Sequence, residues 1–353
     1  MSGPVNFMSR LDASLQTRRL PRYRIVMPAT AEARDADLAE ILIGRFDGLF
    51  MYRFTLAAAY NFVRSTKLQS LPRLKFLERG FLSSLAPIDR LAARHLNRRD
   101  VALKARADAL VYQSRLSHRE HLTFGGPDPV GKPVALIPNG VPLDVFRPLP
   151  RHETLAGSPR LAITAQFRLG KRLREAILVA NRLRAHFPRL TLHVIGDMDR
   201  LVAESLDGLD RSACVFHGRV PSGTLPQLYA GMDIGLSPAL LDPCPNSVIE
   251  MLACGLPVIT TAASGAAELV PSPELIVPEE RPLVWTELHN AHRIPALDEA
   301  AWVGAIDTVL QRRGHWHDVC LEHARRTFDI EVVASRYAEV IEAAAGLRAP
   351  QPT

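Results

Sequence analysis

The 353-residue sequence is poor in cysteine and lacks the cysteine patterns of metal or redox sites. Cys214, Cys244, Cys254 and Cys320 have spacings that match no zinc or redox motif, so we expect reduced thiols in a cytoplasmic protein. No run of about 18 apolar residues occurs, so no membrane span is predicted. The first residues, MSGPVNFMSRLDASLQTRR, contain no apolar core segment, which argues against a secretory signal peptide.

A large excess of charge of one sign is also missing. Lys and Arg number 43 and Asp and Glu number 37, which gives a formal net charge of +6. Such a balance suits anionic partners such as phosphates, nucleotides or anionic lipid, but it does not select nucleic acid, and we expect no nucleic-acid partner. The 47% of apolar residues permits a sizeable core, and the length allows roughly two domains of about 150 residues.

The second half of the chain alternates apolar strand patterns with helical patterns. This alternation predicts an α/β fold with a parallel sheet covered on both faces, which binds ligands at the carboxyl ends of its strands. The expected strands are 160–166, 190–196, 213–218, 233–239 and 256–262, and the expected helices are 171–187, 224–231, 247–254 and 329–346.

The first half is less regular, with strand-like runs at 23–29, 39–46, 107–114 and 134–141. A stretch rich in Pro and Gly at 139–160 predicts the linker between two domains. We therefore expect an N-terminal domain over 1–150, a C-terminal nucleotide-sugar domain over 151–328, a crossover helix over 329–346 and a tail over 347–353.

Two loops that follow predicted strands carry candidate chemistry. Arg168 and Lys171 of FRLGKRL could clamp a diphosphate, although a basic loop is more often simply solvated. The second stretch, DPCPNSVIEMLACGLPVITT, places Asp242 before a helix and Glu250 one turn into it. A helix N-terminus suits a phosphate, and a carboxylate can accept from both ribose hydroxyls. The alternative is that neither residue binds a ligand, with Asp242 an ordinary turn residue and Glu250 a solvated helix residue.

These motifs resemble the retaining glycosyltransferases of family 4, which have the GT-B fold of two facing Rossmann-like domains with the cleft between them. The shared pattern is an acid, seven residues and a Glu, followed by a segment like MLACGLPVITTAASGAAELV. FRLGKRL, IPNGVPLDVFRPLP, ADALVYQSRLS and FDIEVVASRYAEVI are similar to further parts of the family. The resemblance covers about 107–345 well and the first hundred residues poorly.

The resemblance implies a role for each matching residue. Asp242 would contact the transferred sugar, and Arg168 and Lys171 would neutralise the leaving diphosphate. Glu250 would hold the donor ribose, and the backbone N–H groups of Asn246 and Ser247, one of which we expect as the N-cap, would hold phosphate. Ser264 and Gly265 would lie at the sugar. Three departures stand out: Asp for Glu at 242, Pro243-Cys244-Pro245 for Gly-Phe-Gly, and Ala266 for Gly.

The first residues raise a separate question, because SGPVNFMSRLDASLQ resembles the Gly-rich loop and first helix of the N-terminal domain. The strand expected before that loop is missing, which implies either a start further upstream or an N-terminal domain that lacks its first strand. Gly3, Asn6, Asp47 and His118 are the N-terminal cleft candidates, and the family's catalytic histidine is not assigned.

The implied function is transfer of a hexose-type sugar from a nucleotide diphosphate sugar to a glycan or glycolipid acceptor in polysaccharide biosynthesis. The alternatives are a non-catalytic relative that binds nucleotide sugar or glycan, and a sugar-nucleotide epimerase, against which the spacing of the two acids argues. No cofactor and no metal are expected, although DMD at 197–199 mimics a metal motif.

The segment Arg64–Arg106 carries eleven basic and three acidic residues interleaved with Leu and Phe. This composition predicts that the protein attaches to the inner face of a membrane. We expect the protein to sediment with anionic vesicles at low salt and to be released at high salt. Reversing Arg73, Lys75 and Arg79 to Glu should abolish sedimentation, and a protein that stays in the supernatant at low salt would make the segment an ordinary solvated surface.

Overall fold

The computed structural model describes residues 3–18, 23–26, 39–42, 107–123, 133–151, 155–279 and 295–346. The described residues divide into two compact units, and the larger unit combines stretches from 1–19, 112–117 and 136–339. The predicted domain boundaries at 150 and 328 stay predictions. Asp47, the basic segment Arg64–Arg106 and the tail 347–353 lie outside the described residues.

The larger unit contains a six-stranded parallel sheet in the order β10-β9-β8-β5-β6-β7. In chain order this is the 3-2-1-4-5-6 arrangement of a doubly wound sheet, with the topological switch point between β5 and β8. Each of the five strands predicted here is confirmed within a few residues, and the short β10 is an addition. The strands are β5 (Arg160–Thr164), β6 (Thr191–Ile195), β7 (Cys214–Gly218), β8 (Ile234–Ser237), β9 (Val258–Thr261) and β10 (Ile276–Val277).

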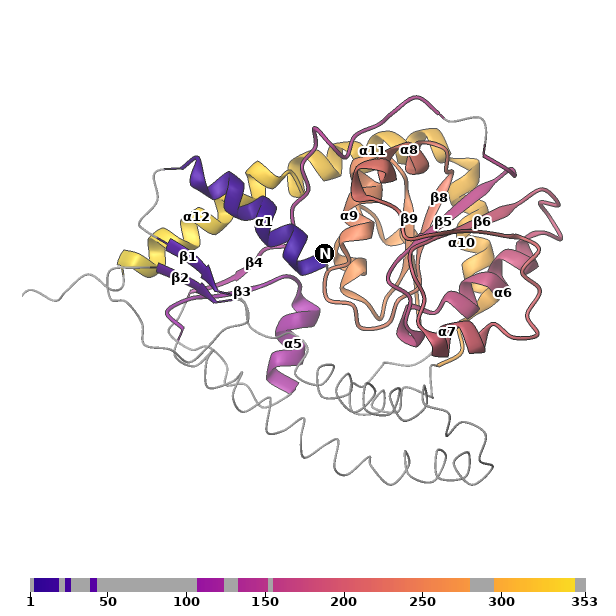
Figure 1. Cartoon of the computed structure of the whole chain (residues 1–353), viewed down its shortest axis with the longest axis horizontal. Coiled ribbons are helices and arrows are strands. Elements are labelled where there is room, and N and C mark those ends of the chain that lie inside the picture. Colours follow the sequence, from indigo (N-terminus) through magenta and orange to yellow (C-terminus); the bar gives the residue numbers. More distant parts are fainter. Residues whose placement is uncertain are drawn as a thin grey trace, which may run out of the picture. The chain divides into compact units, whose positions relative to one another are not determined.

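Helices cover both faces of this sheet (Figure 1), with α10 packed on α6 and α11 packed on α9. Apolar residues of the central strands, such as Leu161, Leu192 and Ile234, are fully buried between the helical layers. The helices are α6 (Leu173–Leu183), α7 (Arg200–Ser205), α8 (Leu225–Ala230), α9 (Asn246–Ala253), α10 (Glu299–Gln311), α11 (Arg313–Thr327) and α12 (Ile330–Gly346).

The end of α9 is fixed by Gly255, which follows the C-cap residue Cys254. Its φ is +76°, which L residues with a side chain rarely adopt. A Cβ there would lie 2.4 Å from the His317 ring, whose Nδ1 is 3.0 Å from the Gly255 carbonyl oxygen. Glycine therefore allows α11 to pack closely on the end of α9.

The remaining described elements come from the first half of the chain. β1 (Tyr23–Val26) pairs in parallel with β2 (Ala39–Leu42), and β3 (Leu110–Tyr112) pairs with β4 (Val134–Leu136). These strands confirm the four strand-like runs predicted there. Two helices complete the set, α1 (Gly3–Gln16), which confirms the predicted first helix, and α5 (Arg115–Thr123).

A buried carboxylate joins the predicted linker to the sheet. Asp233, 2% exposed, lies just before β8 and accepts from the backbone N–H of Arg160 at 2.8 Å. It also pairs with Arg151 at 2.8 Å and with Arg313 at the start of α11. One carboxylate thus holds β5, the linker and α11 together at the edge where the strands begin.

Two histidines on neighbouring strands form a pair whose burial disfavours the protonated form of each ring. The Nδ1 atom of His193 on β6 lies 2.9 Å from Nε2 of His217 on β7, and the rings stack with centroids 5.2 Å apart. His193 is completely buried, and burial, together with the charges of His217 and Arg160, lowers its pKa to about 4. Burial also lowers the pKa of His217.

We expect this pair to make the fold sensitive to acid. Between about pH 6.5 and 4 the unfolded chain binds a proton at His193 that the folded protein does not bind. The free energy of unfolding should therefore fall as pH drops through this window, by roughly 2 kcal/mol at pH 5. Urea unfolding at pH 7.5 and pH 5 measures the loss. His193→Gln should flatten the dependence while the exposed His186→Gln should not, and equal slopes in all three proteins would contradict the assignment.

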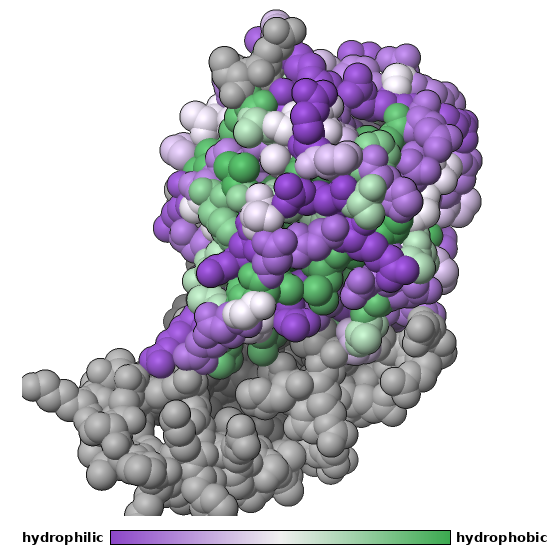
Figure 2. Space-filling view, turned by 90° about the vertical axis from the view of Figure 1, so that its right-hand side faces the viewer, coloured by the Kyte–Doolittle hydropathy of each residue, from purple (hydrophilic) through white to green (hydrophobic). Residues whose placement is uncertain are grey.

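No helix in the described part of the chain is long and apolar enough to cross a membrane. Figure 2 shows that hydrophilic residues cover most of the coloured face turned to the viewer, with hydrophobic residues in scattered patches.

Candidate functional site

The loops that follow β5, β8 and β9 are tied together at the carboxyl edge of the sheet. The backbone N–H of Leu240 donates to the carbonyl of Gly170 at 2.9 Å, and Leu241, with a φ of 54°, donates to Ala263 at 2.9 Å. These bonds hold the three loops in one fixed surface beside the switch point, where doubly wound sheets bind ligands.

Lys171 and Asp242 form an ion pair across the switch point. Lys171 ends the 3-10 helix η2 (Leu169–Lys171) after β5, and Asp242 lies in the loop after β8. Their side chains are 29% and 17% exposed, so both reach solvent from a largely enclosed position. The structure thus brings together the cation predicted to bind the diphosphate and the acid predicted to contact the sugar. Arg168 lies at the N-cap of η2 in an extended conformation and is half-buried.

A buried arginine that the sequence analysis missed anchors the loop behind Lys171. Arg172 has φ 53° and no exposed side-chain surface, and its guanidinium donates to both oxygens of Glu279 at 2.6 and 3.1 Å. Glu279 also accepts from the Thr261 hydroxyl. This bidentate pair fixes the backbone directly after Lys171 to the segment that follows β10. In the sequence, Arg172 is visible only as the third basic residue of FRLGKR, and nothing in that motif indicates its partner Glu279.

The start of α9 differs from the prediction in one respect. The N-cap is Pro245, not Asn246 or Ser247. Proline supplies the extended φ of −69°, and the Asn246 amide oxygen is used elsewhere, accepting from Asn139 Nδ2 at 2.6 Å. The Asn139 backbone N–H contacts the buried Cys244 sulfur at 3.4 Å, and burial raises the pKa of that thiol to about 12. Asn139 therefore contacts both Cys244, in the loop before α9, and Asn246, the first residue of the helix.

Glu250 lies one turn into α9 with a side chain that is 12% exposed. Burial raises the pKa of its carboxyl to about 7, and Arg10 of α1, with Nη1 3.6 Å from Oε1, acts in the opposite direction. The predicted ribose ligand is thus a partly buried acid with one cationic neighbour among the described residues, and the sequence analysis did not foresee this neighbour.

Ser264 and Gly265 shape the loop that carries Asp242. The Ser264 hydroxyl donates to the Asp242 carbonyl at 3.1 Å and accepts from the Ala266 N–H at 3.2 Å, and the Gly265 N–H donates to the Asp242 carbonyl at 2.8 Å. A Cβ at Gly265 would lie 1.9 Å from the Pro243 carbonyl oxygen. The predicted contact of these two residues with a sugar stays a prediction.

Glu268 ends the 3-10 helix η4 (Gly265–Glu268) and caps α5, which the sequence analysis also missed. Its two carboxylate oxygens accept from the backbone N–H groups of Arg115 and Leu116 at 2.8 and 3.0 Å. A carboxylate is stabilising at a helix N-terminus because the exposed N–H groups there carry partial positive charge.

The other predicted site residues fall outside this arrangement or are only partly described. Gly3 and Asn6 lie in α1, where their side chains are not described, and His118 lies in α5. Asp199 of DMD is the N-cap of α7 and accepts from Val202 N–H at 2.9 Å. Among the described residues, no three His, Cys, Asp or Glu side chains gather in a way that could hold a metal ion.

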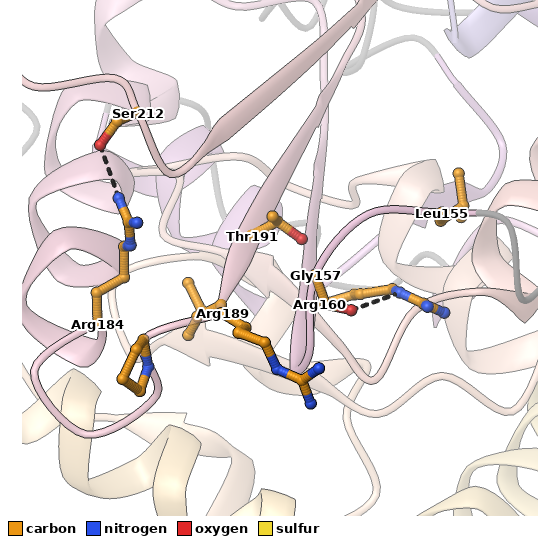
Figure 3. Close-up of a pocket in the computed structure, with 9 residues that line it drawn as sticks. Leu155, Gly157, Arg160, Arg184, Arg189, Thr191 and Ser212 are labelled. Carbon is orange, nitrogen blue, oxygen red and sulfur yellow. Dashed lines mark hydrogen bonds between the residues drawn. The ribbon is translucent and has the colours of Figure 1, made fainter.

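A hollow of about 440 Å³ lies at the opposite edge of the sheet, where β5 and β6 begin. Arg160, Arg184 and Arg189 line it. Figure 3 shows Arg184 donating to Ser212 and Arg160 donating to the Gly157 carbonyl, so both are occupied by the protein itself. The hollow is therefore separate from the loops that carry Lys171 and Asp242.

Comparisons with solved structures and protein families place this architecture. Sucrose-phosphate synthase from Thermosynechococcus elongatus is similar with a TM-score of 0.60 and 16% identity, over 98% of this chain and 94% of that one. HepE from Anabaena, in complex with UDP and glucose, gives 0.57 and 19%, over 71% and 67%. A glycosyltransferase from Rickettsia africae gives 0.54 and 15%, over 71% and 67%.

At these identities the likeness is one of fold, and no curated protein matches the chain. The family model described as glycosyl transferases group 1 matches residues 158–311, which run from just before β5 to the end of α10. Residues 158–311 therefore match the family of glycosyl transferases group 1, within a chain that has the GT-B fold.

Proposed function

We propose that the protein is a retaining glycosyltransferase that moves a hexose-type sugar from a nucleotide diphosphate sugar to a glycan or glycolipid acceptor in polysaccharide biosynthesis. The observation that carries the proposal is the Lys171–Asp242 pair across the switch point of a glycosyl transferases group 1 domain. It offers a cation for a leaving phosphate and an acid for a sugar at one point. Solved structures of similar fold contain UDP, or UDP with glucose, which supports a nucleotide sugar as donor.

The chemistry follows from where charge develops in the reaction. Cleavage of the bond between sugar and phosphate builds positive charge on the anomeric carbon and negative charge on the diphosphate. Lys171, Arg168 and the N–H groups at the start of α9 would stabilise the diphosphate, and Asp242 would contact the sugar. Glu250 would hold the ribose.

The test is turnover of a panel of UDP-, GDP- and ADP-sugars, followed by release of the nucleoside diphosphate. We expect turnover of at least one donor, with the anomeric configuration of the sugar retained in the product by proton NMR, and we expect activity to persist in EDTA. Inversion would contradict the retaining mechanism. Loss of activity in EDTA with rescue by Mg²⁺ or Mn²⁺ would show that Lys171 and Arg168 do not suffice for the leaving group.

A further inference from the structure

Arg10 lies on α1, far in the sequence from the other site residues, yet it belongs to the same compact unit. Contacts with α12 hold α1 in place. The rings of Phe7 and Tyr337 have centroids 6.2 Å apart, and the Ser14 hydroxyl donates to Glu331 at 2.7 Å. Arg18, two residues beyond the end of α1, also donates to Glu331 at 3.0 Å. Arg10 is therefore presented from a packed helix.

The guanidinium of Arg10 lies against a carboxylate and an aromatic ring. Nη1 lies 3.6 Å from the Glu250 carboxylate, and the carbon of the guanidinium lies 5.4 Å from the centroid of the Phe146 ring. The Arg10 side chain is 19% exposed and Glu250 12%. A stacked, largely enclosed guanidinium loses little further freedom when it pairs with a carboxylate, so this pair differs from a solvated surface pair.

Two other described titratable groups interact with Glu250, and neither carries a positive charge. Burial raises the pKa of the Tyr229 hydroxyl well above its usual value and the pKa of the Cys254 thiol to about 12, and the nearby Glu250 charge acts in the same direction on both. Both groups are therefore neutral at physiological pH. Arg10 is the described cation that opposes the effect of burial on the Glu250 carboxyl.

We propose that Arg10 is a positioning residue for the donor nucleotide, which favours the charged form of the Glu250 carboxylate and orients it to accept from both ribose hydroxyls. The inference rests on the proposed function. A protonated carboxyl presents one O–H donor and loses acceptor capacity, so it cannot accept from two neighbouring hydroxyls as a carboxylate does. The cation on α1 thus links the N-terminal helix to nucleotide affinity without contacting the nucleotide.

The experiment measures UDP affinity by calorimetry from pH 6 to pH 9 for four proteins. Arg10→Met removes the charge and keeps the length, Arg10→Lys restores a charge, and Arg18→Met is the control just beyond the end of α1. We expect Arg10→Met to weaken UDP binding at pH 7 by about five-fold if the Glu250 pKa rises from about 7 to about 8, and by more if it rises further. The loss should shrink toward pH 9, where the carboxyl ionises again. Arg10→Lys should recover most of the affinity, and Arg18→Met should resemble wild type.

A second measurement follows Glu250 without any nucleotide. Carbon NMR of protein labelled at the glutamate carboxyl carbons, with the signal assigned by its loss in Glu250→Gln, should show a higher titration midpoint in Arg10→Met than in wild type. An unchanged midpoint, or a loss of UDP affinity that is equal at every pH, would overturn the role of Arg10 and leave the proposed function standing. A wild-type protein that binds no nucleoside diphosphate would overturn the proposed function, and the ribose role with it.

Discussion

Lys171→Met is expected to lower kcat for sugar transfer by about 100- to 1000-fold while changing the donor KM much less. The reason is that the leaving diphosphate gains charge in the transition state, so a cation beside it contributes more there than in the ground state. Lys171 sits on the loop after β5, and Arg172, bonded to both oxygens of Glu279, holds that loop. Steady-state kinetics over a range of donor concentrations gives both constants.

The control is Arg174→Met, which removes an exposed cation three residues further along, on α6, and should leave kcat unchanged. Arg168→Met should behave like Lys171→Met. A rise in KM with an unaltered kcat in both variants would show that these cations bind the donor without acting on the chemical step.

The contributions of Asp242 and Lys171 to catalysis must be measured separately, because the two side chains form an ion pair in the ligand-free protein. A double-mutant cycle with Asp242→Asn does this. If Lys171 serves only to position Asp242, the double variant should be no slower than Asp242→Asn alone. We expect a further loss, because Lys171 would also neutralise the diphosphate.

Glu250→Gln is expected to weaken binding of UDP by about 10- to 150-fold, which corresponds to the loss of about 1.5–3 kcal/mol for hydrogen bonds to a charged group. The change keeps the shape of the side chain and removes its charge inside a nearly buried position on α9. Calorimetry at pH 8, above the pKa of about 7, compares the variant with a wild type in its charged form.

Two controls locate the effect at the ribose. Glu274→Gln alters an exposed carboxylate paired with Arg312 and should leave affinity unchanged. The 2′,3′-dideoxy form of UDP lacks both hydroxyls, so wild type and Glu250→Gln should bind it equally. If the dideoxy nucleotide still distinguishes the two proteins, Glu250 acts on another part of the ligand.

The local pattern of the sequence was enough to predict the alternating strands and helices of the larger unit and the two loops that carry Lys171, Asp242 and Glu250. Periodicity and short motifs report neighbours along the chain, and the parallel sheet then brings the strand ends to one edge. Boundaries were less accurate, as at the strand predicted over 160–166, which ends at Thr164.

The contacts that shape the site could not be predicted in the same way. Glu268 caps α5 from 153 positions away, and Arg172 meets Glu279 across 107 positions, so no local pattern records either pair. The Arg10–Glu250 contact is of the same kind. The N-cap of α9 was wrong for a local reason, because Asn246 looks like a capping residue but its side chain accepts from Asn139.

The most direct test of the central claim is release of nucleoside diphosphate from a panel of nucleotide sugars by wild type and by the Lys171→Met, Asp242→Asn double variant. Hydrolysis by water can report the reaction before the acceptor is identified. The account predicts measurable release from at least one donor by wild type and almost none by the double variant, with both proteins binding the nucleotide. Nucleotide binding without release from any donor would contradict it and favour a non-catalytic relative of the family.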